Sequence, residues 1–409
     1  MTVERLNKSL LAELKNLKDE GRSKAPERII EEVIHPKGSK GYRYRLRGFA
    51  GEYMRMNSNS YLGLSNDQRL VEASDKACKE MGVGPGAVRF IDGTFNYHAD
   101  LEAKIADFTG KPAARIFNSA YTANLGLALT LTTRNTYWIG DQLNHNSIIR
   151  ALRISAVDRD HKDIYIHNSM DDLKRRMEII PNWITRVIII FDGIFSMRGD
   201  YTPLDKVVKI AEEYTDKYPD GVITVIDDSH GVGAYGATGR GTPEFTKADA
   251  DIIVGTFGKA FGCNGGYIAA SNEIVQAISQ MCDTYIYTNP LSCGDCAAAM
   301  KAIEVVDSPE GIELLEKLKN NTEHFRNGII QMGLETIQGV HPIVPILVRS
   351  TNKVHQMVQK LFEYEILVVG LTYPVVPSGD ETIRAQISAA HTEADIDYAI
   401  DCFAKAAKQ

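Results

Sequence analysis

Short apolar runs alternate with amphipathic stretches from about residue 110 onward. The apolar runs cover residues 114–117, 137–140, 187–191, 222–226, 252–254 and 265–270. Their length suits buried strands, whereas the stretches between them, such as 204–214, repeat apolar residues at helical spacing. Strands that alternate with helices in this way predict an α/β fold with a largely parallel sheet covered on both faces.

The two ends of the chain have patterns of their own. Residues 291–332 have helical periodicity, and residues 342–348, 366–369 and 383–387 predict strands that a helix starting at Thr392 closes. Residues 42–47 and 52–56 predict a hairpin. We therefore expect an N-terminal segment of helix and hairpin at 1–60, a large domain at 61–290 and a smaller α/β C-terminal domain at 291–409.

The first twenty residues predict an amphipathic helix. Its leucines stand at positions 6, 10, 11, 14 and 17, so one face of the helix needs another surface to pack on. The segment lacks the apolar core of a signal peptide, and its four acidic residues argue against a transit peptide. No apolar run approaches the roughly 20 residues that span a membrane. We expect a cytoplasmic protein.

Composition excludes several classes of function. The chain is 44% hydrophobic and 24% charged, as in ordinary globular proteins, and its net charge of −7 argues against a general nucleic-acid role. Six cysteines in 409 residues do not form a disulfide framework. Cys293 and Cys296 have the spacing of a redox or zinc motif, but no second pair accompanies them, and a helix start after Pro290 is favoured.

Lys259 is the first candidate for chemistry. It follows the apolar run 252–254 and the turn Gly255-Thr-Phe-Gly258, so a buried strand delivers it to a turn among small and apolar residues. Such surroundings depress the pKa of an amine, and a neutral lysine forms Schiff bases with carbonyls, including pyridoxal phosphate (PLP). A phosphate-binding loop is excluded, because that motif needs Gly and Ser or Thr where Ile253 and Ala260 stand.

A carboxylate partner for Lys259 ends the preceding strand. The apolar run 222–226 leads into Asp227-Asp-Ser-His230, at the end of the strand where parallel sheets bind ligands. PLP needs a carboxylate that keeps its pyridine nitrogen protonated, and Asp227 can supply it. A solvated pair of aspartates in a turn is the alternative reading.

Two glycine motifs resemble dinucleotide fingerprints. Gly82-Val-Gly-Pro-Gly-Ala87 follows a helical pattern rather than a strand, and Gly231-Val-Gly-Ala-Tyr-Gly236 leads into more glycines rather than a helix. Both lack the strand-to-helix context that gives the motif its meaning. We therefore predict no dinucleotide site.

Taken together, several blocks of the chain resemble the α-oxoamine synthase family of PLP enzymes. The blocks are Asp227-Asp-Ser-His230, Gly239-Arg-Gly241, Gly255-Thr-Phe-Gly-Lys-Ala260, Asn144-His145, Phe195-Ser-Met197, Thr288-Asn-Pro-Leu291, Tyr373-Pro-Val-Val-Pro377 and the run 383–392. The likeness covers nearly all of the chain after residue 40. It implies the fold-type-I architecture, with a large PLP-binding domain, a smaller C-terminal domain and active sites shared across a homodimer.

The resemblance also implies roles for individual residues around the reacting atoms. Lys259 would bind PLP as a Schiff base and then remove the Cα proton of the amino acid. Asp227 would pair with the pyridinium nitrogen, and His145 would stack on the ring. His230 and Ser196 would hydrogen-bond the phenolic oxygen.

The remaining implied contacts concern the phosphate and the substrate. The phosphate would lie on the backbone of Ser119, Ala120 and Tyr121 at a helix N-terminus, where free N–H groups and the helix dipole favour an anion. Thr256, and Thr288 from the neighbouring subunit, would add hydroxyls. Arg384, assisted by Asn59, would bind the carboxylate of the amino acid. No metal site is predicted.

Within the family the sequence is most similar to glycine C-acetyltransferase. That likeness implies condensation of glycine with acetyl-CoA, giving a 2-amino-3-oxo acid and free CoA. The alternative is a synthase like 8-amino-7-oxononanoate synthase or serine palmitoyltransferase, using alanine or serine with a longer acyl thioester. A non-catalytic partner subunit is a third possibility, which the presence of Lys259 disfavours. No basic cluster in the sequence identifies the residues that hold CoA.

Overall fold

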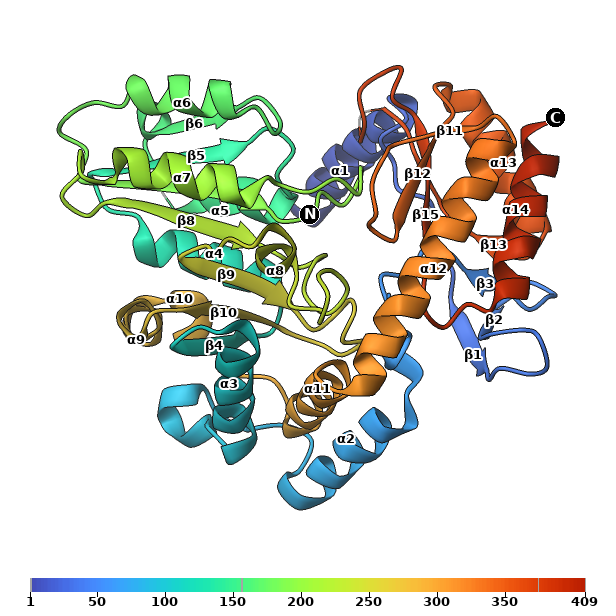
Figure 1. Ribbon diagram of the computed structural model, residues 1–409, viewed down its shortest axis with the longest axis horizontal. Coiled ribbons are helices and arrows are strands. Elements are labelled where there is room, and N and C mark those ends of the chain that lie inside the picture. Colours follow the sequence, from blue (N-terminus) through green and yellow to red (C-terminus); the bar gives the residue numbers. More distant parts are fainter. Residues whose placement is uncertain (1, 156, 374, 409) are drawn as a thin grey trace.

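The computed structural model describes residues 2–155, 157–373 and 375–408. Its largest sheet has seven strands in the order β4-β10-β9-β8-β7-β5-β6 (Figure 1). These strands are β4 (Ala113–Phe117), β5 (Thr136–Asp141), β6 (Lys162–Tyr165), β7 (Arg186–Asp192), β8 (Val222–Asp227), β9 (Ile252–Thr256) and β10 (Gly266–Ala270). Only β10 runs antiparallel to its neighbours. The predicted α/β class and its mainly parallel sheet are confirmed.

The apolar runs form central strands because both of their faces are buried. In β7, Val187 and Ile189 point into one apolar cluster, and Ile188 and Ile190 point into another on the opposite face. Successive side chains of a strand face opposite ways, so a continuous apolar run fits only a strand with helices on both sides.

Helices cover the two faces of this sheet. One face carries α4 (Ala120–Leu131), α5 (Asn146–Ile154), α9 (Asn272–Met281) and α10 (Asp283–Ile286). The other carries α3 (Asn96–Thr109), α6 (Met170–Glu178), α7 (Leu204–Thr215) and α11 (Cys293–Val306), and α2 (Gln68–Met81) packs on α11. The short α8 (Thr242–Thr246) follows the loop after β8. Cys293 begins α11 after the N-cap Ser292, so the helix interpretation of the cysteine pair is confirmed.

The C-terminal part forms a second layer. A four-stranded antiparallel sheet has the order β11 (Glu335–Thr336), β12 (Ile343–Leu347), β15 (Thr382–Gln386) and β14 (Val369–Leu371). It packs with α13 (Thr351–Glu363) and α14 (Glu393–Ala407), while the long α12 (Pro309–Gln331) runs between the two sheets (Figure 1). Helix α14 begins after Thr392, as predicted. The domain boundaries at residues 60 and 290 remain predictions.

The predicted N-terminal hairpin forms only in part, because its two strands take their main partners elsewhere. Strand β2 (Arg43–Leu46) pairs with β1 (Ile30–Ile34), and β3 (Met54–Arg55) pairs in parallel with β13 (Ile366–Leu367). The two predicted hairpin strands are joined by one antiparallel bridge, between Tyr44 and Tyr53, and by an ion pair between Arg45 and Glu52 (3.7 Å). The cause is burial: Met54 and Met56 belong to the apolar cluster of the C-terminal part, which draws this strand away from β2.

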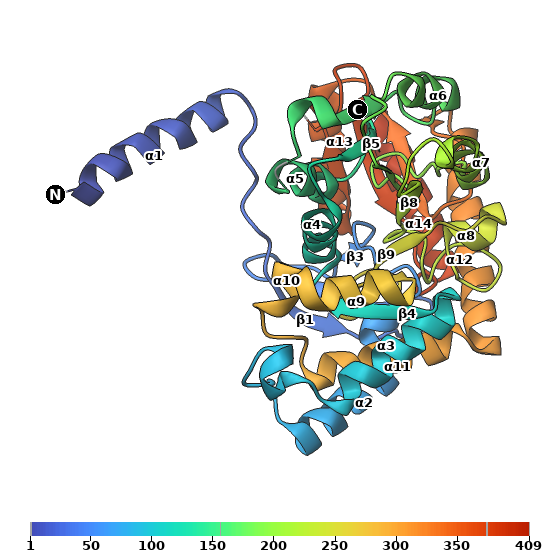
Figure 2. The same ribbon diagram turned by 90° about the vertical axis from the view of Figure 1, so that its left-hand side faces the viewer.

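The N-terminal helix α1 (Thr2–Asp19) forms but projects from the rest of the chain (Figure 2). Leu6, Leu10, Leu11 and Leu14 are 44–65% exposed, so the described part of this chain does not cover the apolar face. The surface that we expected the helix to pack on is therefore not found in the single chain. No helix among the described residues combines the length and apolar character needed to traverse a bilayer.

Candidate active site

Two neighbouring strands end in carboxylates at the same edge of the large sheet. Asp192 of β7 and Asp227 of β8 are register partners. The Asp227 carboxylate accepts hydrogen bonds from Asn124 Nδ2 (2.7 Å) and from the backbone N–H of Ser229 (3.1 Å). Asp228 points elsewhere, because its carboxylate accepts the Thr242 N–H (2.8 Å) and hydroxyl (2.6 Å). Of the adjacent pair, only Asp227 is available to a ligand.

Lys259 lies in the turn between β9 and β10, beside these carboxylates. The chain leaves the sheet after Thr256 and returns at Gly266, so the turn carries the lysine to the same edge as Asp227. Burial lowers the pKa of Lys259 to about 8, although the charges of Asp227 and Asp192 oppose that shift. A minority of the amine is therefore neutral near physiological pH, far more than for an ordinary lysine, and this neutral form is the one that Schiff-base chemistry needs.

These groups line one cavity of about 200 Å³, here called the active-site cavity. Its lining residues are Ser119, Ala120, Tyr121, His145, Ser147, Asp192, Ser196, Asp227, Ser229, His230, Thr256 and Lys259. All the predicted cofactor-binding residues except Thr288 are in this set. The structure therefore brings together residues that are up to 140 positions apart in the chain.

His145 is held in place at the start of α5. Its backbone N–H donates to Asp192 Oδ2 (2.7 Å), and its Nδ1 accepts the Ser147 N–H (3.2 Å). Burial lowers the pKa of His145, so its ring is neutral at physiological pH. Burial together with the charge of Asp227 raises the pKa of Asp192 well above its usual range. The hydrogen bond from its backbone N–H to Asp192 Oδ2 nevertheless fixes the position of His145.

His230 is fixed on the opposite wall. Its Nδ1 is 2.8 Å from the Tyr61 hydroxyl, and its carbonyl accepts a hydrogen bond from His341 Nε2 (2.9 Å). Burial lowers the pKa of His230 well below its usual range, so this ring also stays neutral. With Nδ1 occupied by Tyr61, the predicted contact to the phenolic oxygen falls to Nε2.

The N-terminus of α4 forms the anion-binding end of the cavity. Ser119 is the N-cap, and its hydroxyl accepts the Thr122 N–H (3.1 Å). The N–H groups of Ala120 and Tyr121 belong to the first turn, where no intrahelical acceptor exists. Gly266 of β10 passes directly beneath, and a Cβ there would overlap the Ala120 nitrogen. This close approach of strand and helix holds the free N–H groups at the cavity.

The two predicted threonine ligands are placed differently. Thr256 lines the cavity, but its hydroxyl donates to the Gly265 carbonyl (3.0 Å) and accepts the Gly258 N–H (3.1 Å). In this structure the Thr256 hydroxyl therefore stabilises the turn between β9 and β10 that carries Lys259. Thr288 lies outside the cavity of its own chain, and its hydroxyl accepts from Asn118 Nδ2 (3.3 Å). Its predicted role from a neighbouring subunit remains a prediction.

Arg384 and Asn59 lie beside the cavity. Arg384 Nη1 donates to the Ser196 carbonyl (2.7 Å), while Arg384 Nε is buried without a partner among the described residues. An unpaired donor on a buried guanidinium suits a carboxylate ligand. Asn59 accepts a hydrogen bond from Gln386, two residues along the same strand, β15. Strand β15 thus carries Arg384 itself and, through Gln386, holds Asn59 in place.

Sequence reasoning missed several residues of the site. Asp192, Ser147 and Ser229 line the cavity, and Tyr61 orients His230. Asp192 could have been found, because it ends a predicted strand next to the strand of Asp227. No such signal in the sequence pointed to Tyr61, because its hydrogen bond to His230 joins residues 169 positions apart.

Comparison with known proteins places this architecture in a family. The family described as aminotransferase class I and II matches residues 51–403. The 8-amino-7-oxononanoate synthase of Thermoanaerobacter pseudethanolicus is 35% identical over 88% of this chain and 88% of that protein, and that of Geobacter metallireducens is 35% identical over 98% and 99%. Serine palmitoyltransferase from S. paucimobilis, solved with PLP and myriocin bound, superposes with a TM-score of 0.86 at 27% identity, covering 98% and 97% of the two chains.

The chain belongs to the α-oxoamine synthases, within the class I and II aminotransferase family. The fold-type-I architecture and the PLP cofactor follow from this membership. The more specific likeness to glycine C-acetyltransferase is not confirmed, since these relatives carry the names of the alternative synthases.

The residues of this α-oxoamine synthase fit PLP on chemical grounds. One cavity offers an amine of lowered pKa, a hydrogen-bonded carboxylate and a helix N-terminus, which match the aldehyde, the ring nitrogen and the phosphate. The buried Ser229 hydroxyl has no partner among the described residues, so a donor remains free for a ligand. When bound, PLP supplies the electron sink that allows loss of a proton or of CO2 from an amino-acid Cα.

Proposed function

We propose that this protein condenses a small amino acid with an acyl-CoA, giving an α-amino ketone or 2-amino-3-oxo acid and free CoA. The observation that carries the proposal is the convergence of Lys259, Asp227 and the α4 N-terminus on one cavity. Beside it, the Nε of Arg384 has no partner among the described residues. Overall, a Cα–H bond and the thioester C–S bond break, a C–C bond forms between the Cα and the acyl carbon, and the proton ends on the thiol of CoA; where the product is an α-amino ketone, the amino-acid carboxylate also leaves as CO2.

Four residues of the chain would have separate roles in this reaction. Arg384 binds the carboxylate of the amino acid and sets its orientation. Lys259 Nζ takes up and returns the proton at Cα, which its lowered pKa favours. Asp227 holds the proton on the ring nitrogen, while the neutral His145 covers the ring face and excludes water.

We favour alanine with an acyl chain longer than acetyl as the substrates. The relatives named 8-amino-7-oxononanoate synthase are 34–37% identical to this chain, and the serine palmitoyltransferase structure is 27% identical. This support goes to the synthase alternative rather than to glycine and acetyl-CoA. Glycine C-acetyltransferase activity remains the competing reading, and the test below separates the two.

A second cavity supports a CoA thioester as the donor. It has a volume of about 410 Å³ and lies along α5 and β6. Gly140 and Asn144 line it, and Asn144 directly precedes His145 of the active-site cavity. Arg153, Arg159 and Lys162 line it together with apolar side chains of α5. In the described part of the chain, neither Arg153 nor Arg159 forms a salt bridge. Unpaired cations around an apolar wall suit the phosphates and the adenine of CoA.

The first experiment is release of free CoA thiol by the PLP-loaded protein across a grid of amino acids and acyl-CoAs. Lys259→Ala is the blank. We expect turnover with alanine and a medium or long acyl chain. Turnover with glycine and acetyl-CoA alone would overturn the substrate assignment and leave the family intact. No turnover in the grid despite bound PLP would overturn the CoA donor in favour of a carrier-bound acyl group or a non-catalytic role.

A matched pair of variants tests the basic cavity. Arg159→Gln should raise the KM for acyl-CoA about two- to fivefold, because a partly exposed ion pair contributes about 0.2–1 kcal/mol. The KM for the amino acid should stay unchanged. Arg150→Gln is the control, since Arg150 is exposed on α5, the helix along the cavity, but does not line it. Equal effects of the two variants would contradict this assignment.

A further inference from the structure

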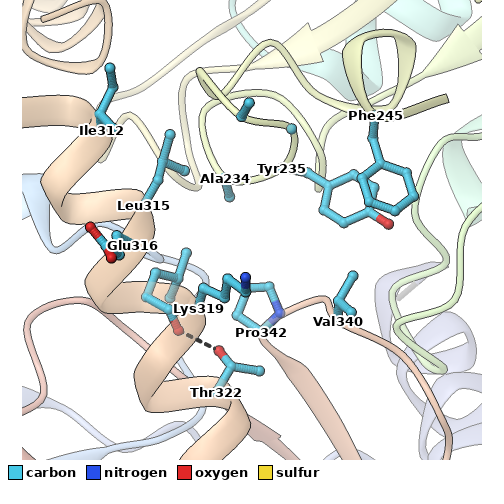
Figure 3. Close-up of a pocket in the computed structure, with 13 residues that line it drawn as sticks. Ala234, Tyr235, Phe245, Ile312, Leu315, Glu316, Lys319, Thr322, Val340 and Pro342 are labelled. Atoms are coloured by element: carbon cyan, nitrogen blue, oxygen red, sulfur yellow. Dashed lines mark hydrogen bonds between the residues drawn. The ribbon is translucent and has the colours of Figure 1, made fainter. Parts of the chain in front are cut away.

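A cavity of about 520 Å³ lies between the large sheet's loops and the C-terminal part, away from the active-site residues. We call it the junction cavity. Its walls are the loop after β8 with α8, the N-terminal half of α12, and the segment before β12 (Figure 3). None of its lining residues lines the active-site cavity. Its volume falls within the range of pockets that bind small molecules.

The walls of the junction cavity are mostly hydrocarbon. Tyr235 and Phe245 stack with ring centroids 4.3 Å apart, and Leu315 and Pro342 lie opposite them (Figure 3). Ile312 at the mouth is 50% exposed. Apolar surface left in water costs about 25 cal/mol per Å², so an apolar ligand that covers it gains free energy.

One cation stands at the rim of this apolar space. Lys319 extends from α12 on the side of the cavity and is 65% exposed, whereas the carboxylate of Glu316 is turned to the other flank of the helix (Figure 3). The ammonium of Lys319 is 4.0 Å from Glu323, a weak contact on the exposed side of the helix. An apolar wall with a single available cation is complementary to an amphiphile with one anionic head.

His341 connects the junction cavity and the active-site cavity, although it lines neither of them. This residue lies between Val340 and Pro342, which both line the junction cavity. Its Nε2 donates to the His230 carbonyl, and its ring packs against Tyr61 and Tyr235, with centroids 5.3 Å and 5.8 Å away. A ligand that presses on Tyr235 or Pro342 therefore acts on the residue that supports His230.

We propose that the junction cavity binds a small aliphatic monocarboxylate, with its chain between Tyr235 and Leu315 and its carboxylate at Lys319. Its occupancy is transmitted to the cofactor through His341 and His230. The ligand class follows from the lining alone and does not depend on which substrates the enzyme uses.

The test is calorimetric titration of the PLP-loaded protein with octanoate, using octylammonium for comparison. We expect one octanoate per chain, weaker binding of octylammonium, and a change in the PLP absorption band that saturates with the binding curve. Lys319→Gln should weaken octanoate binding about two- to fivefold. Leu315→Trp, which fills the cavity, should weaken it about tenfold or more and remove the change in absorption.

Two further variants keep the test decisive. Ile312→Glu places a negative charge at an exposed position of the mouth, where folding is unaffected, and should weaken octanoate binding as well. Lys317→Gln is the charge-matched control, because Lys317 is exposed on the same helix and does not line the cavity. The proposal is overturned if the three cavity variants bind octanoate as tightly as the natural protein and the Lys317→Gln control do. It is also overturned if an acyl-CoA displaces octanoate while the three cavity variants leave octanoate binding unchanged.

Discussion

Lys259 is a buried amine that has to act as a nucleophile. Its protonation state should therefore control how fast the protein captures PLP. Burial lowers the pKa of Lys259 to about 8, and only the neutral amine attacks an aldehyde. In the apoprotein, the rate of PLP capture should therefore rise with pH and reach half its maximum near pH 8. Stopped-flow absorbance measures this rate, and Lys259→Ala gives the non-covalent background. A midpoint near 10.5 would show that the amine is solvated.

His167 forms a charged network behind the loop that carries Ser196. Its Nδ1 is 2.9 Å from Asp141 and its Nε2 is 3.1 Å from Asp200, while its ring packs edge-on against Phe195. Burial alone lowers the pKa of His167, but the hydrogen bonds and charges of the two aspartates outweigh it and raise the pKa to about 9. The imidazolium therefore links the end of β5 to the 195–200 loop.

This network predicts a stability that falls as pH rises. The folded-state pKa of about 9 exceeds the usual 6.5, so the contribution is complete below pH 6.5 and is lost by about pH 9. The loss is about 3 kcal/mol at 1.36 kcal/mol per pKa unit. Thermal unfolding of the holoenzyme at pH 6 and 9.5 should show the loss in the natural protein and not in His167→Gln. His324→Gln, which removes an exposed partner of Asp397, should retain it.

At the scale of elements, strands were predictable where both of their faces are buried, and helices where apolar residues recur at helical spacing. The runs that became β7, β8 and β9 are apolar because both faces of the sheet are covered, and Asp227 could be located because it ends such a run. The parallel pairing of β3 with β13 was not predictable, because the two strands lie more than 300 residues apart in the chain. The basic cavity was missed for a related reason: Arg153, Arg159 and Lys162 come from three different elements and meet only in the fold.

The crossing of β10 beneath α4 gives a prediction at the same scale. Gly266→Ala should push the N-terminus of α4 away from the phosphate position, because a Cβ at Gly266 overlaps the Ala120 backbone. Overpacking of this kind costs about 1–3 kcal/mol, which corresponds to about 5- to 150-fold in PLP affinity. Equilibrium titration of the apoprotein with PLP measures it. Gly84→Ala is the control, since a Cβ there meets no atom within 4 Å.

For the whole molecule, the single chain leaves apolar surface near the site uncovered. Tyr287, next to Thr288, is 72% exposed, and Phe90 and Ile91 are more than half exposed. The leucine face of α1 is uncovered as well. Exposed aromatic and aliphatic side chains in such numbers are typical of a protein–protein interface. They support the proposal that two copies associate at this face, with Thr288 of one completing the site of the other.

Hybrid dimers test this sharing of active sites. A hybrid of one Lys259→Ala chain and one Thr288→Ala chain contains, if Thr288 acts across the interface, one site with both Lys259 and Thr288 intact. Its activity should reach about half that of the natural dimer, although both parent homodimers are impaired. If Thr288 served its own chain, each site of the hybrid would lack one of the two residues. Activity no greater than half that of the Thr288→Ala homodimer would therefore exclude sharing. Differently tagged copies allow the hybrid to be purified, and CoA release under the conditions of the natural enzyme gives the comparison.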